Sequence, residues 1–246
     1  MQFHEIVAEG NRVLVAARTA DVPLWLLGGL GIEHHLGAAI PRALRRDYED
    51  IDLATPNARS RDLSDLLERL GYLPHREFNA LNGTRRLMFF NSERRWKVDV
   101  FVGGFEMCHS IPIIGRLSRD LFAIPLAELL LTKLQVFQLN EKDRRDLVAL
   151  LLLAPIGDHD TGVINGRFIA QMLANDWGLW RTTRLNLDRI RDGVADYELT
   201  AHDLHRVQQR CDELWALIEA EPKSFSWRIR DRVGDLWRWY QVPEEV

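Results

Sequence analysis

The sequence contains few cysteines and carries little net charge. Its 246 residues include two cysteines, Cys108 and Cys211, which stand far apart and outside any spacing that is typical of metal ligands. We therefore expect reduced, structural thiols in a cytoplasmic protein. The formal net charge of −4 argues against a general electrostatic attraction to nucleic acid or to an anionic membrane, although it leaves room for a local basic groove.

Long apolar segments and targeting signals are also missing. The longest apolar runs, such as residues 147–156, are too short to span a bilayer. The first residues lack a basic stretch followed by an apolar one, so we expect no signal peptide. With 46% apolar and 28% charged residues, the composition is that of an ordinary soluble globular protein. A chain of this length can form one large domain or two smaller ones.

Hydrophobic patterning predicts both helices and strands in the first part of the chain. Helical periodicity marks residues 3–20, 30–37, about 60–70, about 125–137 and 141–153. Strand-like runs mark residues 24–27, 50–54, 84–91 and 96–102, with a short strand or two expected within 111–124. The strands at 84–91 and 96–102 are expected to form a hairpin through residues 91–93.

The part of the chain after residue 155 is predicted to be helical. Residues 155–166 contain proline and several glycines without periodicity, which is typical of a linker. Helices are expected at about 166–175, 178–194, 199–220 and 224–241. We therefore predict an α/β domain at residues 1–155 and a C-terminal helical domain at residues 166–246. The second domain holds six of the eight tryptophans, which we expect in a core or an interface.

Two aspartates one residue apart, Asp50 and Asp52, are the most informative feature of the chain. Residues i and i+2 of a strand project from the same face, so both carboxylates would point one way while Ile51 and Leu53 face a core. Two adjacent negative charges repel unless a cation lies between them, and hard carboxylate oxygens suit Mg²⁺. The pattern therefore indicates a candidate site for metal-assisted phosphoryl chemistry.

Further residues extend this candidate site. Gly28 and Gly29 end a short strand and open a helix, where the backbone can approach a ligand closely and free N–H groups favour phosphate oxygens. Asp99 would complete a carboxylate trio if its strand pairs beside that of Asp50 and Asp52. Such a trio could hold two metal ions. Arg46, four residues before Asp50, could add charge-assisted hydrogen bonds to a triphosphate.

These residues resemble the nucleotidyltransferase superfamily with the DNA polymerase β-like fold. The resemblance covers roughly residues 20–155 and implies an α+β fold, in which a mixed sheet with flanking helices precedes the C-terminal helical bundle. It implies that Gly28 and Gly29 contact the triphosphate and that the three aspartates bind Mg²⁺. Asp99 would also help to deprotonate the acceptor hydroxyl. The chain departs from the family pattern at Leu30, where a serine often stands.

The downstream segment is similar to the AbiEii-type toxin nucleotidyltransferases. The similarity rests on Glu128, Lys133 and the run Lys142-Asp143-Arg144-Arg145-Asp146-Leu147. It implies that Lys133 assists the triphosphate and that Asp143 or Asp146 is a supporting or catalytic carboxylate. The residues alone leave an alternative open, because Lys133 could extend from a helix into solvent and the following charges could form surface pairs.

The sequence therefore predicts an enzyme, a Mg²⁺-dependent nucleotidyltransferase that uses an NTP, with ATP as the expected substrate. It would transfer a nucleoside monophosphate to a hydroxyl group and release pyrophosphate. The acceptor stays open between a small aminoglycoside-type alcohol, an RNA and a protein. Expected partners are an antitoxin or a second copy bound through the C-terminal helices, and no membrane. The alternative is a non-catalytic nucleotide- or partner-binding module that retains the fold.

Overall fold

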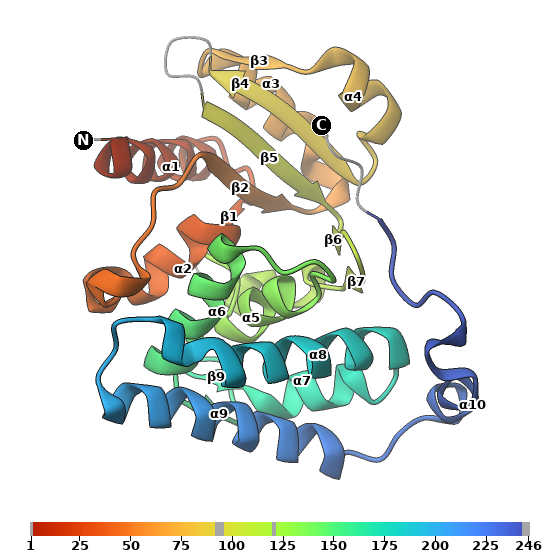
Figure 1. Cartoon of the computed structure of the whole chain (residues 1–246). Coiled ribbons are helices and arrows are strands. Elements are labelled where there is room, and N and C mark those ends of the chain that lie inside the picture. Colours follow the sequence, from red (N-terminus) through yellow and green to blue (C-terminus); the bar gives the residue numbers. More distant parts are fainter. Residues whose placement is uncertain (1, 92–95, 120–121, 243–246) are drawn as a thin grey trace. The chain divides into compact units, whose positions relative to one another are not determined.

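The structure is a computed structural model that describes residues 2–91, 96–119 and 122–242 (Figure 1). The chain divides into two compact units. The first, the sheet unit, consists of Met1–His35, Asp47–Glu106 and Ser110–Pro125. The second, the helical unit, consists of Leu36–Arg46, Met107–His109 and Leu126–Val246. The predicted domain boundary at 155–166 stays a prediction, although the two units group residues 126–155 with the C-terminal helices.

A five-stranded mixed sheet forms the centre of the sheet unit. The strand order is β1 (Trp25–Leu26), β2 (Asp50–Thr55), β5 (Trp96–Val102), β4 (Arg86–Asn91) and β3 (Tyr72–Pro74). Strands β2 and β5 pair in parallel, and the other neighbouring strands pair antiparallel. This arrangement confirms the predicted α+β class with a mixed sheet. The connection between β4 and β5, residues 92–95, lies outside the described residues.

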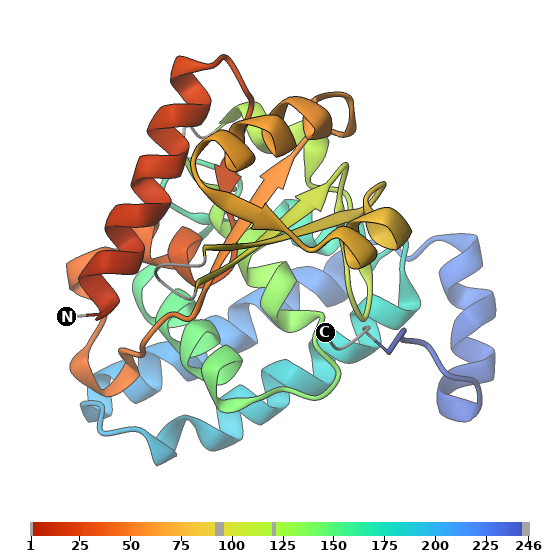
Figure 2. The same ribbon diagram turned by 90° about the horizontal axis from the view of Figure 1, so that it is seen from above.

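Helices cover the apolar face of this sheet. Alternation along β2 and β5 gives one face Ile51, Leu53, Val98 and Val100, all of which are fully buried. Against that face pack α1 (Gln2–Thr19) and α3 (Ser60–Arg69), which contribute apolar side chains to the same core (Figure 2). The unit also contains α2 (Gly28–Leu36) and α4 (Arg76–Asn82). The opposite face of β2 and β5 carries the acidic residues together with Lys97, Ala54 and Phe101.

Part of the segment 111–124 differs from its prediction. One short strand, β7 (Ser110–Ile111), pairs with β6 (Phe105–Glu106), but a 3₁₀ helix follows at Ile114–Arg119. The expectation of strand structure beyond residue 111 was therefore wrong within the described residues, apart from an isolated bridge from Ala123 to Leu26. The apolar side chains of this segment, such as Ile113 and Leu117, are buried without forming a ladder.

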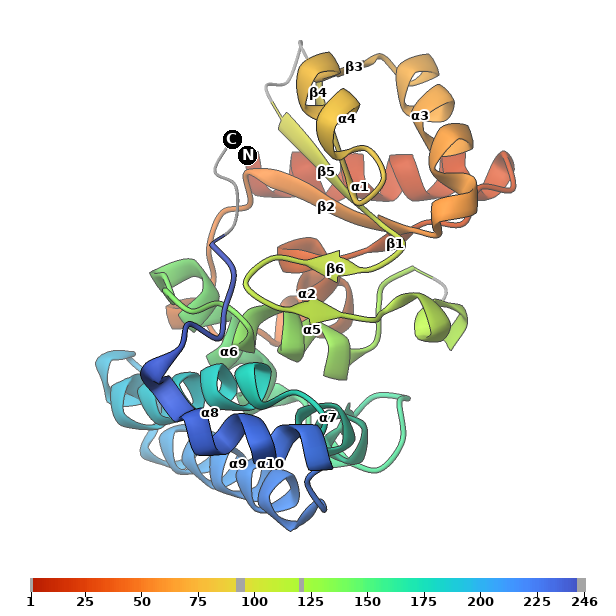
Figure 3. The same ribbon diagram turned by 90° about the vertical axis from the view of Figure 1, so that its right-hand side faces the viewer.

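The helical unit is built from α5 (Leu126–Leu134), α6 (Glu141–Leu153), α7 (Gly166–Leu173), α8 (Trp177–Gly193), α9 (Ala201–Ala220) and α10 (Phe225–Val233). Figure 3 shows α7, α8, α9 and α10 packed together. Side chains of Asn140, Asn165, Asp176, Thr200 and Ser224 cap the helices that follow them. A short parallel pair, β8 (Ile156–Gly157) and β9 (Ile164–Asn165), lies within the predicted linker.

The last predicted helix is too long. Residues 224–241 were expected to be helical, but α10 ends at Val233 because Gly234 takes a positive φ of 58°. A 3₁₀ turn at Gly234–Leu236 follows, and Trp237 begins an extended segment. Of the tryptophans expected in a core or interface, Trp177 and Trp227 are buried, whereas Trp237 is 71% exposed. None of the helices in the described part of the chain is long and apolar enough to cross a membrane.

Candidate active site

The parallel pairing of β2 and β5 brings the predicted carboxylates onto one face of the sheet. Asp52 lies directly opposite Asp99 in the register, and Asp50 lies opposite Lys97. Since Ile51 and Leu53 are buried on the other face, the alternation predicted from the sequence holds on both strands. The three aspartates therefore share the sheet face that is free of the α1–α3 core.

Gly28 lies against the carboxylate of Asp52. Its φ of 56° is a left-handed conformation that favours glycine, and a Cβ atom at this position would collide with Asp52 Oδ2. The preceding amide, Leu27 N–H, donates to the Asp52 carbonyl over 2.9 Å and fixes the turn against β2. Gly29 is buried in the first turn of α2. Gly28 and the Asp52 side chain thus lie in close contact, which only a residue without a Cβ atom allows.

Two basic residues that the sequence interpretation missed lie among these carboxylates. Arg86, at the start of β4, donates from Nε to Asp99 Oδ1 over 2.7 Å and from Nη2 to Asp99 Oδ2 over 2.6 Å. Lys97 Nζ lies 3.6 Å from Asp50 Oδ2 and 3.4 Å from Asp99 Oδ2. Lys97 could have been found by strand periodicity, because it lies two residues before Asp99. Arg86 could not, because its contact depends on the register of β4 against β5.

The guanidinium of Arg86 responds to all three aspartates. Burial lowers the pKa of Arg86, but its hydrogen bonds to Asp99 and the charges of Asp99, Asp52 and Asp50 outweigh burial and raise the pKa above its ordinary value. The Asp99 side chain is 3% exposed and that of Asp50 is 42% exposed. Asp99 is therefore a buried carboxylate with a permanently charged partner, while Asp50 is open to solvent.

Arg86 competes with a metal ion for one of the three predicted metal ligands. Both oxygens of Asp99 accept hydrogen bonds from Arg86. Among the residues that the structure describes, no group of three or more His, Cys, Asp or Glu side chains is placed to hold a metal ion. Magnesium binding by Asp50, Asp52 and Asp99 stays a prediction.

The remaining predicted residues meet in an ion-pair network inside the helical unit. Arg46 donates to both oxygens of Asp146 over 2.9 and 2.7 Å. Lys133 Nζ lies 2.7 Å from Asp143 Oδ1 and 2.9 Å from Asp146 Oδ2. The network thus balances two cations with two carboxylates. The predicted roles of Arg46, Lys133 and Asp143 toward a triphosphate stay predictions.

Burial and charge oppose each other in this network. Burial lowers the pKa of Lys133, but the charges of Asp146 and Asp143 raise it more strongly, so the net pKa lies above its ordinary value. Burial raises the pKa of Asp146, but the charge of Lys133 and the hydrogen bond from Arg46 lower it more strongly, so its net pKa is depressed. Lys133 and Asp146 are therefore both charged at neutral pH.

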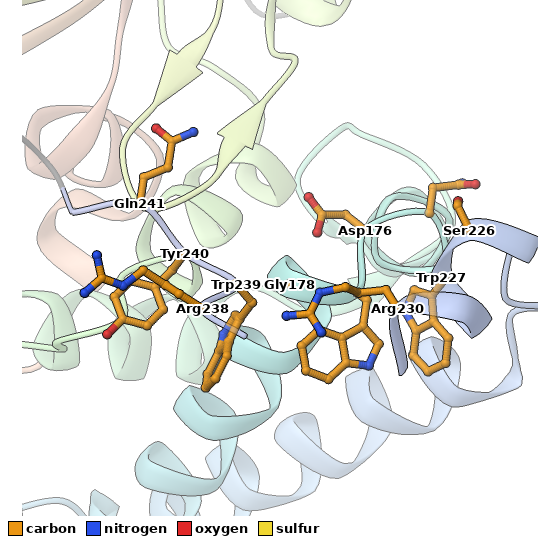
Figure 4. A pocket seen from close by; sticks show the side chains of 11 residues that line it. Asp176, Gly178, Ser226, Trp227, Arg230, Arg238, Trp239, Tyr240 and Gln241 are labelled. Atoms are coloured by element: carbon orange, nitrogen blue, oxygen red, sulfur yellow. The ribbon is translucent and has the colours of Figure 1, made fainter. Parts of the chain in front are cut away.

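The helical unit also contains an aromatic pocket of about 550 Å³ (Figure 4). The rings of Trp177, Trp227, Trp239 and Tyr240 line it together with the cations Arg230 and Arg238 and the carboxylate of Asp176. Arg230 lies 4.4 Å from the ring centroid of Trp177 and donates to the carbonyls of Gly234 and Trp237. These bonds hold the segment after α10 in place. The pocket contains none of the site residues predicted from the sequence.

The first part of the chain is similar to known proteins. The family model described as aminoglycoside-2''-adenylyltransferase matches residues 11–94. Curated 2''-aminoglycoside nucleotidyltransferases from Escherichia coli and Klebsiella pneumoniae are each 36% identical over 61 residues, which is 25% of this chain and 32% of the relative. The chain thus matches about a third of the length of these curated relatives.

Two solved structures are weakly similar to most of the chain. The solution structure of the antibiotic-resistance factor ANT(2'')-Ia has a TM-score of 0.41 and 15% identity, over 89% of this chain and 97% of that one. The crystal structure of ANT(2'')-Ia in complex with adenylyl-2''-tobramycin has a TM-score of 0.40 and 15% identity, over 86% and 99% of the two chains.

The sequence matches confirm the predicted resemblance to the nucleotidyltransferase superfamily. The matched members are aminoglycoside nucleotidyltransferases. The matched segment contains Gly28, Gly29, Arg46, Asp50 and Asp52. Asp99 and the residues on which the similarity to AbiEii-type toxins rests, 128–147, lie outside it, so that similarity stays a prediction.

Proposed function

We propose that this protein is an enzyme that transfers a nucleoside monophosphate from an NTP to a hydroxyl group and releases pyrophosphate. One observation carries the proposal. Asp52 has the Gly28 turn against its carboxylate on one side and Asp99 in register on the other, within and next to the segment that matches 2''-adenylyltransferases. A strand pair with a purely structural role would not need a glycine pressed against an acidic side chain.

The residues of the sheet unit suggest a division of roles. The amides that open α2 at Gly28 and Gly29 can bind phosphate oxygens, because the first N–H groups of a helix have no partner within it. Asp50 and Asp52, both partly exposed, are the carboxylates that we expect to bind Mg²⁺. Asp99 is expected to accept the proton of the acceptor hydroxyl once its oxygens are released.

The acceptor that we propose is an aminoglycoside-type alcohol, with ATP as the nucleotide. The support is the match of residues 11–94 to the aminoglycoside-2''-adenylyltransferase model and the names of the curated relatives. The formal charge of −4 also favours a cationic acceptor over an RNA. The aromatic pocket gives no support, because Arg230 and Arg238 would repel a polyamine there.

The proposal is tested by pyrophosphate release. The protein is incubated with each of the four NTPs, Mg²⁺ and tobramycin, other aminoglycosides, tRNA or no acceptor, and the products are identified by mass spectrometry. We expect release that depends on an aminoglycoside and on ATP. Asp52→Asn should lower the rate at least roughly 100-fold, since it removes a charge that acts on the reacting phosphate. Asp62→Asn, at an exposed ion pair on α3, is the matched control and should keep the rate.

The outcome that rejects the proposal is pyrophosphate release that is absent with every acceptor or equal in wild type and Asp52→Asn. The alternative, a non-catalytic nucleotide-binding module, is favoured by one observation, the bidentate ion pair between Arg86 and Asp99. It predicts calorimetrically detectable binding of ATP without turnover of any acceptor. An antitoxin partner and a dimer through the C-terminal helices stay predictions.

A further inference from the structure

Arg86 pairs with Asp99, the carboxylate that we expect to accept the proton of the acceptor hydroxyl in the proposed reaction. Its two bonds to Asp99, at 2.7 and 2.6 Å, form a bidentate pair, the strongest geometry that a guanidinium and a carboxylate can adopt. The Asp99 side chain is 3% exposed, so water competes little for it. In this state Arg86 bonds both oxygens of Asp99 and competes there with a metal ion and with the proton of an acceptor.

The balance of charge on this sheet face indicates when Arg86 can leave. Among the described residues, the three aspartates and the two cations that pair with Asp50 and Asp99, Arg86 and Lys97, together carry one negative charge. A divalent cation added to this arrangement would make the cluster positive, and Arg86 would repel it at close range. A nucleotide brings several negative phosphate oxygens with its metal. It therefore supplies both the charge that displaces Arg86 from Asp99 and a new partner for the guanidinium.

The surroundings of Arg86 allow such a movement. Its side chain is 18% exposed, and its guanidinium lies 5.3 Å from the ring centroid of Phe101 and 5.7 Å from that of Phe78. Aromatic faces stabilise a cation without fixing its hydrogen-bond direction. The guanidinium can therefore turn away from Asp99 while it stays near the two rings.

We infer that Arg86 is a counter-ion switch, which neutralises Asp99 while the site holds no ligand and transfers to phosphate oxygens when a metal–nucleotide complex binds. Arg86 would then be a positioning residue for the carboxylate and a ligand of the nucleotide. The inference rests on the proposed function. It explains why a buried carboxylate of the predicted trio has a bidentate partner that the trio's metal would have to displace.

The switch predicts effects of opposite sign on metal and on nucleotide binding. We would measure Mn²⁺ binding by electron paramagnetic resonance and the binding of a non-hydrolysable ATP analogue with Mn²⁺ by calorimetry. Without nucleotide, Arg86→Gln should bind Mn²⁺ roughly tenfold more tightly than wild type, because the competing charge is gone. The same variant should bind the analogue roughly tenfold more weakly, because one charge-assisted contact is lost.

The neighbouring Arg85 provides the matched control. It pairs with Glu106 over 3.2 Å at the surface, with its side chain 72% exposed, and Arg85→Gln should change neither affinity. Arg86→Lys keeps the charge but not the bidentate geometry, and it should lie between wild type and Arg86→Gln in both measurements. It also serves as the second variant if Arg86→Gln fails to fold.

The position of the guanidinium can be followed directly in the wild-type protein. The Nε–H group of Arg86, which is hydrogen-bonded to Asp99, should give a distinct ¹⁵N–¹H NMR signal, assigned by its loss in Arg86→Lys. Saturating Mg²⁺ and analogue together should shift this signal, whereas Mg²⁺ alone should not. A signal that stays unchanged under saturation overturns the switch.

The outcomes separate the switch from the proposed function. If wild type binds Mn²⁺ and the analogue but Arg86→Gln changes both affinities in the same direction or not at all, the switch is wrong and the proposed function stands. If neither wild type nor any Arg86 variant binds metal or analogue, the switch and the proposed function are both overturned.

Discussion

At the scale of single residues, Gly28 is the position with the least freedom in the candidate site. An alanine there would combine a disfavoured left-handed φ with a collision against Asp52 Oδ2. We expect Gly28→Ala to displace the Asp52 side chain and to abolish pyrophosphate release, with a loss of stability above the about 1–2 kcal/mol that a left-handed alanine costs. Urea unfolding and the pyrophosphate assay measure the two effects separately.

Gly71 is the control position, because it has a positive φ like Gly28 but no neighbour with which a Cβ atom could collide. It has a φ of 90°, and a Cβ atom there would have no neighbour within 4 Å. Gly71→Ala should therefore lose only about 1–2 kcal/mol and keep its activity. Equal activity in the two alanine variants would show that the contact between residue 28 and Asp52 has no functional role.

The sequence predicted the acidic and glycine positions of the site better than the basic ones. Asp50, Asp52 and Asp99 follow from a period of two along a strand, and their alignment needs only that two strands be neighbours. The bond from Arg86 to Asp99 depends on which residues of β4 and β5 face each other. One strand's sequence contains no information on that register, so the counter-charge could not be predicted.

At the scale of secondary-structure elements, Asp146 joins α5 to α6. Its carboxylate, on α6, binds Lys133 of α5 and also Arg46. Replacing it with asparagine leaves two buried cations with one carboxylate, so we expect Asp146→Asn to lose about 3 kcal/mol of unfolding free energy at pH 7. Because the pKa of Asp146 is depressed in the folded state, this contribution is present above the unfolded pKa and disappears as the pH falls below about 4.

Urea unfolding at pH 7 and at pH 3 checks this prediction. The difference between wild type and Asp146→Asn should shrink at the lower pH, because the Asp146 carboxyl group is then protonated in the unfolded state and its charge stabilises the folded state less. Asp143→Asn is the control, because that carboxylate bonds Lys133 alone within the network and is 13% exposed, so it should lose less. A difference that stays constant with pH would show that packing, and not charge, accounts for the loss.

Long elements were predicted well and short ones poorly. The helices α1, α3, α6 and α9 lie close to their predicted ranges because several apolar residues repeat in each. Strand β3 and helix α4 were not predicted, since three and seven residues contain too few repeats to show a period. The end of α10 was missed because Gly234 was read as part of a helix, although glycine is the usual residue just after a helix end.

At the scale of the whole molecule, the grouping of α5 and α6 determines where the chain can be divided. Composition placed the boundary in the proline- and glycine-containing segment 155–166. The amino-acid composition of a segment indicates where regular secondary structure ends. It does not indicate which helices pack together. In the structure α5 and α6 contact α8 and α9 of the helical unit, and their apolar residues Leu129, Leu130, Leu147 and Leu150 are fully buried.

A chain cut at the predicted boundary should therefore not fold properly. We expect residues 1–155 alone to aggregate or to bind a hydrophobic dye, because α5 and α6 would lose the helices that cover their leucines. The control is the full chain with a protease site placed beside Gly162, a position with a positive φ and no neighbour to a Cβ atom. After cleavage at that site the two fragments should stay together and keep the circular dichroism and urea midpoint of the intact chain, because the contacts between helices are unchanged. If residues 1–155 are instead monomeric, unfold cooperatively and bind no dye, the boundary read from composition is right and α5 and α6 belong with the sheet.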